Sequence, residues 1–237
     1  MRRELWWRSL LAARHPDIRG VSLAYLDQHS LLCANVNDFL EQQDIFDTEM
    51  ASLVEEGMKY ADSISDAVNV SSVYPVLWNA ERILCGLLYA SVILEKPQIV
   101  IETGIGNGFS TRVIQKALAE TKGELHSFDI RTEVRDFGLE KHNSFIHILD
   151  KKNANKELSS IISSLKPIDI WFHDANHTYR WQKFEYQLAL ASLKPSGLLI
   201  SDDIDASEAW LRFSKRNLLK SYCLIDTRKV IGIVRKP

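Results

Sequence analysis

The chain has 237 residues, of which 46% are hydrophobic and 25% charged, and its formal net charge is −2. This length and composition are typical of a globular protein with a full hydrophobic core, built as one domain with an appended element. The balanced charge, without a dense basic stripe, argues against nucleic acid as a partner and favours a small molecule.

The cysteines and the apolar runs indicate the compartment. Cys33, Cys85 and Cys223 are odd in number and far apart, which fits neither a disulfide framework nor a zinc-ligand spacing. We expect them to be reduced and buried in a cytoplasmic protein. The first residues lack the apolar core of a signal peptide, and the longest apolar run, residues 83–94, is too short to span a bilayer. Neither secretion nor a membrane partner is expected.

Helical patterns dominate the first 95 residues. The expected helices cover residues 5–13, 31–43, 46–60 and 76–94, and Pro97 ends the last of them. We therefore predict a helical N-terminal cap over residues 1–95 and a second domain over residues 96–237. Trp6 and Trp7 are interpreted as packing residues of the first helix. A homo-oligomer contact through the N-terminal helices is left open as their other role.

Beyond residue 96, β-rich runs alternate with helical segments, which predicts parallel strands joined by right-handed crossovers. The closing runs 221–226 and 230–235 are joined by a short connection, so the last strand is expected to pair antiparallel. The fold class is therefore α/β, a Rossmann-like sheet that is mostly parallel, with an antiparallel last strand and the helical cap. One helical stripe is expected to face the core, and it consists of Trp181, Phe184, Leu188 and Ala191.

Each of five predicted strands ends in a carboxylate. Acids fill 31 of 237 positions, so chance would place one at roughly one position in eight. Ligands of open α/β sheets bind outside the carboxyl ends of the strands. This acidic rim therefore predicts a site for a cationic ligand. The strand-end acids are Glu102, Asp129, Asp150, Asp174 and the pair Asp202 and Asp203.

The loop after the first of these strands reads Glu102-Thr-Gly-Ile-Gly-Asn-Gly-Phe-Ser110. Its glycines allow a sharp turn and a close backbone approach to a ligand. A dinucleotide fingerprint would need a glycine where Phe109 stands, and a P-loop would need Gly-Lys-Ser/Thr, so both are disfavoured. At the next strand end, Asp129 can accept hydrogen bonds from both hydroxyls of a ribose.

Together with Ser-Phe-Asp-Ile at residues 127–130, this loop resembles the class I S-adenosylmethionine (SAM)-dependent methyltransferases over about residues 80–237. The resemblance implies SAM as the cofactor. It also implies that the glycine loop holds the methionine end, that Asp129 binds the ribose and that Asp150 lies near the adenine amino group. A helix N-cap is the alternative role of Ser110, and a strand-end turn that of Asp129. The implied cofactor-binding residues are Glu102, Gly104, Gly106, Gly108, Ser110, Asp129 and Asp150.

A second motif, Asp174-Ala-Asn-His177-Thr-Tyr179 with Asp202-Asp203, resembles the metal-dependent small-molecule O-methyltransferases of the catechol type and, more closely, of the macrocin type. The resemblance implies Asp174, Asp202 and Asp203 as ligands of a divalent cation such as Mg²⁺. It implies His177 as the general base, acting beside Asp174. A divalent ion and a sulfonium would balance three carboxylates. The alternative is that the acid pair caps the following helix and that His177 packs at its own helix start.

The expected function is methyl transfer from SAM to a hydroxyl of a small molecule of sugar or natural-product type, assisted by a divalent metal and a histidine base. One alternative is metal-independent transfer to an amine of an amino sugar. The nine acids and single base between Asn37 and Asp66 support it, although a solvated helix face explains them as well. The remaining alternatives are a nicotinamide-dependent oxidoreductase, disfavoured by Phe109, and a non-catalytic module that kept the cofactor pocket.

Overall fold

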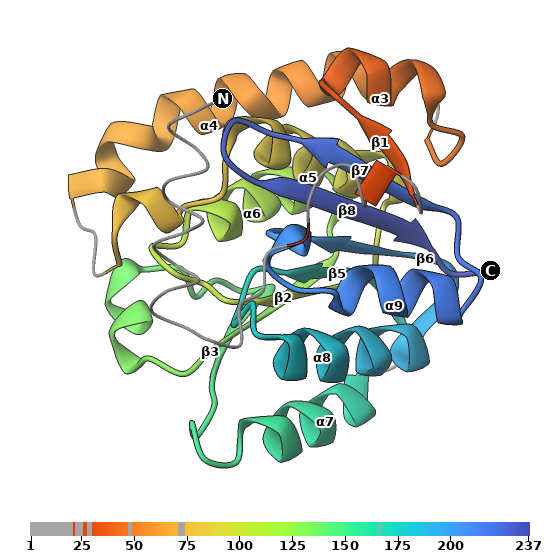
Figure 1. The fold of residues 1–237 in the computed structure, drawn as a ribbon. Coiled ribbons are helices and arrows are strands. Elements are labelled where there is room, and N and C mark those ends of the chain that lie inside the picture. Colours follow the sequence, from red (N-terminus) through yellow and green to blue (C-terminus); the bar gives the residue numbers. More distant parts are fainter. Residues whose placement is uncertain (1–20, 22–25, 28–29, 47–48, 71–73, 166) are drawn as a thin grey trace.

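The computed structural model describes residues 21, 26–27, 30–46, 49–70, 74–165 and 167–237. These residues form one eight-stranded sheet with helices on both faces (Figure 1). Along the sheet the strand order is β1, β7, β8, β6, β5, β2, β3, β4. The strands are β1 (Leu31–Cys33), β2 (Ile99–Thr103), β3 (Glu124–Asp129), β4 (Ser144–Ile148), β5 (Ile168–His173), β6 (Leu193–Ser201), β7 (Ser221–Ile225) and β8 (Val230–Arg235).

Strand direction follows from the connections. β8 pairs antiparallel with β6 and β7, whereas every other pair in the sheet is parallel. The turn between β7 and β8 is closed by a hydrogen bond from the Asp226 amide to the Lys229 carbonyl, at 3.0 Å, and so short a connection joins antiparallel strands. The predicted α/β class, with a mostly parallel sheet and an antiparallel last strand, is confirmed.

The helices form one layer on each side of the sheet. In Figure 1, α4, α5 and α6 lie over one face, and α7, α8 and α9 lie over the other. The α-helices are α3 (Val36–Gln42), α4 (Met50–Val70), α5 (Arg82–Glu95), α6 (Phe109–Thr121), α7 (Ala154–Leu165), α8 (Tyr179–Ser192) and α9 (Ala209–Arg216), and the 3₁₀ turns are η1 (Val76–Trp78), η2 (Thr132–Phe137) and η3 (Ile204–Ala206).

The core is split by the sheet into two hydrophobic clusters. Val100 and Ile170 belong to the cluster under α4, α5 and α6, whereas their chain neighbours Ile101 and Trp171 belong to the cluster under α7, α8 and α9. Successive strand residues point to opposite faces. Because both faces are covered, the central strands β2 and β5 bury apolar residues on both faces, as expected for parallel strands inside an α/β protein, and most of their polar residues lie at the strand ends.

The helices of the predicted cap pack directly on the rest of the chain. α4 and α5 contact each other and α6, and all three share one hydrophobic cluster. α5 ends at Glu95, where Lys96 takes a left-handed φ of 46° and Pro97 follows. The predicted helix end before Pro97 is therefore confirmed. The division into residues 1–95 and 96–237 stays a prediction.

The helix predicted over residues 31–43 was wrong in its first part. Leu31–Cys33 forms β1, which pairs in parallel with β7 at the edge of the sheet. The helix α3 starts only after Asn35, whose side chain accepts hydrogen bonds from the amides of residues 37 and 38. The helix predicted over residues 5–13, with Trp6 and Trp7 and their oligomer contact, lies outside the described residues.

The stripe expected to face the core from α8 is confirmed in part. Trp181, Phe184 and Leu188 are half buried and pack against the hydrophobic cluster on this side of the sheet, whereas Ala191 is exposed. The buried face of α8 carries polar residues, and it consists of Gln182, Glu185, Tyr186, Ala189 and Ser192.

The three cysteines are buried and unpaired, as expected. Among the described residues, none of the helices combines the length and the apolar character needed to cross a bilayer.

Candidate active site

The acidic strand ends lie together beyond the carboxyl ends of the central strands, where backbone hydrogen bonds continue after the strands end. The Asp174 amide donates to the Thr103 carbonyl at 2.8 Å, and the Asp202 amide donates to the His173 carbonyl at 2.8 Å. The Gly104 amide donates to the end of β3, also at 2.8 Å. These bonds place the glycine loop after β2 between the end of β3 and the ends of β5 and β6.

The glycine loop has the conformation that its sequence requires. Gly104 has a φ of +86°, and a Cβ there would lie 2.0 Å from the Asp174 carbonyl oxygen. Gly106 has a φ of +54°, but a Cβ built on it would meet nothing within 4 Å, so its backbone borders open space. Gly108, with a φ of +75°, directly precedes α6. A ligand can therefore approach this backbone and the N-terminus of α6.

Glu102 is fully buried, and among the described residues its carboxylate accepts hydrogen bonds only from hydroxyl groups. Its Oε1 accepts from Ser110 at 2.6 Å, and its Oε2 accepts from Thr111 at 2.8 Å and from Ser127 at 2.6 Å. Burial raises the pKa of Glu102 to about 7, although the three hydroxyl bonds act against the rise. Glu102 and Ser110, both predicted at the methionine end of the cofactor, thus fasten the start of α6 to β2 and β3.

Asp129, at the end of β3, is buried and its carboxylate is fully engaged. Oδ2 accepts from the Ile105 and Gly106 amides at 3.0 and 3.3 Å, and Oδ1 accepts from the next two amides after Asp129 at 2.7 and 3.0 Å. The Tyr74 hydroxyl also donates to Oδ1, at 3.0 Å. A carboxylate offers about four lone-pair positions. A ribose bound by Asp129 would therefore compete with Tyr74.

Asp150 lies two residues beyond β4 and is exposed. Its carboxylate accepts from the Lys152 amide at 3.1 Å and from the Asn153 side chain at 2.7 Å. These bonds shape the turn before α7, and its role near an adenine stays a prediction.

Asp174, His177, Asp202 and Asp203 come together as the sequence predicts, and Lys229 joins them. His177 Nε2 lies 3.6 Å from Asp174 Oδ1, and its Nδ1 lies 3.6 Å from Asp203 Oδ2. Lys229 Nζ forms an ion pair with Asp202 Oδ2 and lies 3.8 Å from Asp203 Oδ2. Asp203 has a left-handed φ of 46°, a conformation that aspartate tolerates better than most residues.

The charges in this cluster depend on one another. Burial alone would lower the pKa of Lys229, but the three surrounding carboxylates raise it well above its ordinary value. Burial, opposed by Lys229, raises the pKa of Asp174 well above its ordinary value and that of Asp202 to about 6. Burial lowers the pKa of His177 to about 4. The lysine is therefore held as an ammonium ion and the histidine as a neutral imidazole at pH 7.

Residues 101–204 match a family model described as a methyltransferase domain. This segment of the chain is similar to a methyltransferase domain. The matched segment begins inside β2 and ends just after Asp203. It contains the glycine loop, Asp129, Asp174, His177, Asp202 and Asp203, but not Lys229. The predicted resemblance to class I methyltransferases is confirmed.

Several solved structures share the fold of this chain. The O-methyltransferase TomG from Streptomyces achromogenes, involved in tomaymycin synthesis and solved with SAM, is 15% identical, covers 75% of this chain and 90% of its own, and has a TM-score of 0.58. The O-methyltransferase from Bacillus cereus in complex with S-adenosylhomocysteine (SAH) is 14% identical, with 76% and 91% covered and a TM-score of 0.52. SAH-bound PaMTH1 from Podospora anserina is 12% identical, with 93% and 99% covered and a TM-score of 0.55. No curated protein matches the sequence.

The side chains of Asp174, Asp202 and Asp203 do not fit the divalent ion that the sequence predicts. In the part of the chain that the structure describes, no three His, Cys, Asp or Glu side chains are arranged to hold a metal ion. The oxygens of Asp202 and Asp203 instead share the Lys229 ammonium. A divalent cation among the same oxygens would be repelled by that ammonium at close range.

Sequence reasoning missed Lys229, although the β-hairpin contained a signal for it. Ser201 of β6 pairs with Gly232 of β8 in an antiparallel register, so the residues after Ser201 lie beside the residues before Gly232. The start of β8 is therefore adjacent to the acid pair that ends β6. Had the register been assigned, a basic residue at position 229 could have been placed near Asp202.

Glu185 was missed as well. This fully buried carboxylate accepts from the indole N–H groups of Trp171 and Trp181 at 2.9 and 2.7 Å, and it lies 2.9 Å from His173 Nδ1. Burial alone would raise the pKa of Glu185, but His173 and the hydrogen bonds hold it below its ordinary value. The network fixes the end of β5, just before Asp174, against α8.

Proposed function

We propose that this chain is a SAM-dependent O-methyltransferase that transfers a methyl group to a hydroxyl of a small molecule. The carrying observation is that the glycine loop with Asp129 and the cluster of His177 with Asp174 lie side by side. They are joined by the hydrogen bond from the Asp174 amide to the Thr103 carbonyl, at 2.8 Å. A donor pocket and a proton acceptor in contact are what direct methyl transfer requires.

The residues of the donor side suit SAM. The open space at Gly106 admits a ligand to the loop backbone, the N-terminus of α6 favours a carboxylate, and Asp129 favours a ribose once Tyr74 has moved. When bound, SAM supplies a methyl group on a sulfonium, whose positive charge the acidic rim attracts. Gly104, Gly106, Gly108 and Asp129 would hold it. Glu102 and Ser110 keep the loop in shape.

His177 is the group best placed to accept the proton of the acceptor hydroxyl. Its Nε2 is buried and has no hydrogen-bond partner in the described structure, and Asp174 and Asp203 lie 3.6 Å from its two ring nitrogens. The proton of the hydroxyl would pass to Nε2 while the methyl carbon exchanges its bond to the sulfonium sulfur for a bond to the hydroxyl oxygen, which leaves neutral SAH. The neighbouring carboxylates then stabilise the imidazolium that forms.

A hydroxyl is favoured over an amine as the acceptor group. The acids of α4 and the segment before it, which would attract a cationic amine, are partly paired with bases: Glu55 with Lys59, Asp62 with Arg82, and Asp44 with Lys220. We further propose an acceptor of sugar or natural-product type. TomG, which has a similar fold, is involved in tomaymycin synthesis. The buried, unpaired cysteines suit a cytoplasmic location.

The test combines binding with product analysis. Calorimetric titration with SAH should show saturable binding. Incubation with methyl-labelled SAM and a panel of sugars, phenols and amines should then yield a methyl ether as judged by mass spectrometry. A protein that does not bind SAH would refute the proposal, and a methylated amine as the only product would refute the choice of acceptor.

A further inference from the structure

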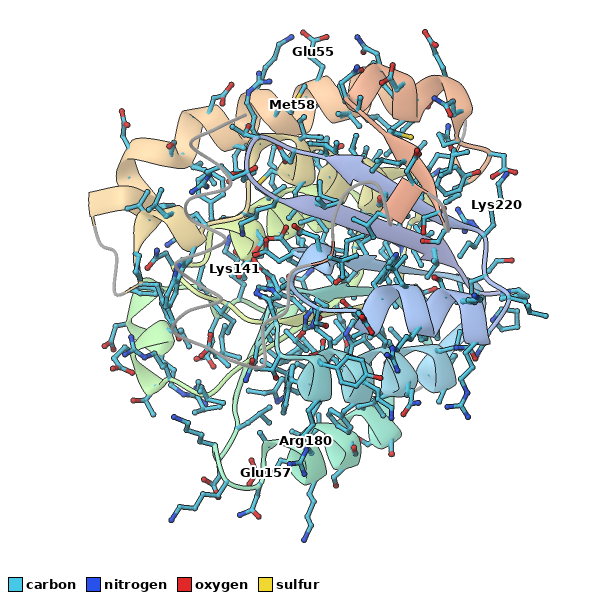
Figure 2. All side chains as sticks on the ribbon, viewed as in Figure 1. Glu55, Met58, Lys141, Glu157, Arg180 and Lys220 are labelled. Atoms are coloured by element: carbon cyan, nitrogen blue, oxygen red, sulfur yellow. The ribbon has the colours of Figure 1, made fainter. Side chains whose placement is uncertain are left out.

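Lys229 is buried in a way that surface lysines are not. Its side chain is 8% exposed, whereas that of Lys220, also ion-paired with an aspartate, is 60% exposed. Figure 2 shows Lys220 at the outer edge of the molecule. Removing an ammonium ion from water costs several kcal/mol unless strong partners replace the water. A lysine is therefore retained at this depth only because the surrounding carboxylates balance its charge.

The β-hairpin that carries Lys229 is fastened to the first turn of α5. The Asp226 carboxylate accepts from the Leu84 amide at 3.0 Å. Glu81 accepts from the Arg228 amide at 2.8 Å and also forms an ion pair with the Arg228 guanidinium. Asp226 and Arg228 of the β7–β8 turn are thus held, and the Lys229 side chain that follows them forms an ion pair with Asp202.

The carboxylates around Lys229 come from two strand ends. Asp174 follows β5, and Asp202 and Asp203 follow β6. Asp202 is fully buried and its Oδ1 has no hydrogen-bond partner among the described residues, while its Oδ2 binds Lys229. Without a cation the close carboxylates would repel one another. The only charged basic side chain that the described residues place against Asp202 is Lys229.

We propose that the Lys229 ammonium is the resident cation of this site, standing where a divalent ion would otherwise bridge Asp202 and Asp203, so that methyl transfer by this chain requires no divalent metal. Lys229 is then a positioning residue: it holds Asp202 and Asp203, and through Asp203 the imidazole of His177. The inference rests on the proposed function only where it speaks of methyl transfer. The occupation of the acid pair by a lysine is testable without any turnover.

The experiment is a calorimetric titration of chelator-treated protein with Mn²⁺, for wild type, Lys229→Ala and the surface control Lys220→Ala. We expect no saturable binding by wild type or by Lys220→Ala. Lys229→Ala should bind one Mn²⁺ saturably, with an affinity roughly tenfold or more above the weakest that the wild-type titration could have detected, because Asp174, Asp202 and Asp203 have lost the neighbouring positive charge. Asp203→Asn added to Lys229→Ala should abolish that binding. Mn²⁺ binding by wild type that Asp203→Asn removes, or no binding by folded Lys229→Ala, would overturn the proposal.

Two further measurements separate the possible failures. Circular dichroism shows whether Lys229→Ala is folded, and if it is not, the wild-type titration with its Asp203→Asn control still decides. SAH titration of the same samples tests the donor pocket independently. A wild type that binds SAH but also needs Mn²⁺ for turnover would refute the lysine proposal alone, whereas absent SAH binding would refute the proposed function and leave the Mn²⁺ result standing.

Discussion

Replacing Glu102 by glutamine should change the pH dependence of stability. Glu102 is the fully buried carboxylate that binds the hydroxyls of Ser110, Thr111 and Ser127. Glutamine keeps its shape and can still accept hydrogen bonds from hydroxyls, but it cannot ionise. The substitution therefore isolates the cost of holding a negative charge at this position.

The sign and size of the effect follow from the pKa. Burial raises the pKa of Glu102 from an ordinary 4.5 to about 7. Between these values the folded chain binds the proton more tightly than the unfolded chain, so the stability that this group contributes is full below about pH 4.5 and is lost as the pH rises to about 7. The gap in pKa corresponds to about 3 kcal/mol.

The assay is urea unfolding at pH 5 and pH 8, followed by the fluorescence of the six tryptophans. Relative to wild type, Glu102→Gln should gain about 2.5 kcal/mol of unfolding free energy between pH 5 and pH 8, because part of the full effect is already lost at pH 5. Asp174 and Asp202 are present in both proteins, so their titrations cancel in the difference. The exposed Glu55 provides the control Glu55→Gln, which should show no such gain. Equal pH dependence of wild type and Glu102→Gln would refute the reasoning.

Three substitutions test the site. Asp129→Asn should weaken SAH binding roughly 10- to 150-fold in calorimetry, because charge-assisted hydrogen bonds are worth about 1.5–3 kcal/mol. Tyr74→Phe should tighten SAH binding in the same titration, because the phenol no longer competes for Asp129 Oδ1. His177→Gln should lower kcat by roughly 10²- to 10⁴-fold in the methyl-transfer assay without changing SAH affinity, because only the proton acceptor is lost.

Each of these has a result that contradicts it. Unchanged SAH affinity in Asp129→Asn would remove Asp129 from the ribose site. Weaker binding by Tyr74→Phe would show that the phenol contacts the ligand instead of competing with it. Full turnover by His177→Gln would assign proton acceptance to another group, and an equal loss of SAH affinity would show that His177 is structural.

The sheet and most of its site residues could be predicted from the sequence because the signals are local. A strand buried on both faces is a short apolar run, and the acid at its end follows directly in the chain. The short spacing of Asp174 and His177 also predicted that they lie together, although residues 174–177 form the loop between β5 and α8 and not a helical turn. The strand Leu31–Cys33 was not predicted, because three residues are too few to show the alternation of apolar and polar residues that indicates a strand.

The remaining features depend on contacts between distant parts of the chain. Lys229 meets Asp202 only through the β6–β8 register, and Tyr74 reaches Asp129 from the segment before α5. The buried polar face of α8 reverses the usual apolar rule, because Glu185 finds its donors on β2, on β5 and on α8 itself. Hydrophobic periodicity cannot reveal a buried carboxylate whose partners lie on other elements.

The contact between Gly104 and the Asp174 carbonyl limits how this protein can change over evolution. A Cβ at position 104 would lie 2.0 Å from that oxygen, so a substitution there must displace the end of β5 and Asp174 with it. The glycine loop and the end of β5 therefore cannot shift independently of each other. Under the proposed function, a change of acceptor would have to come from segments that do not touch this contact, while the donor loop stays as it is.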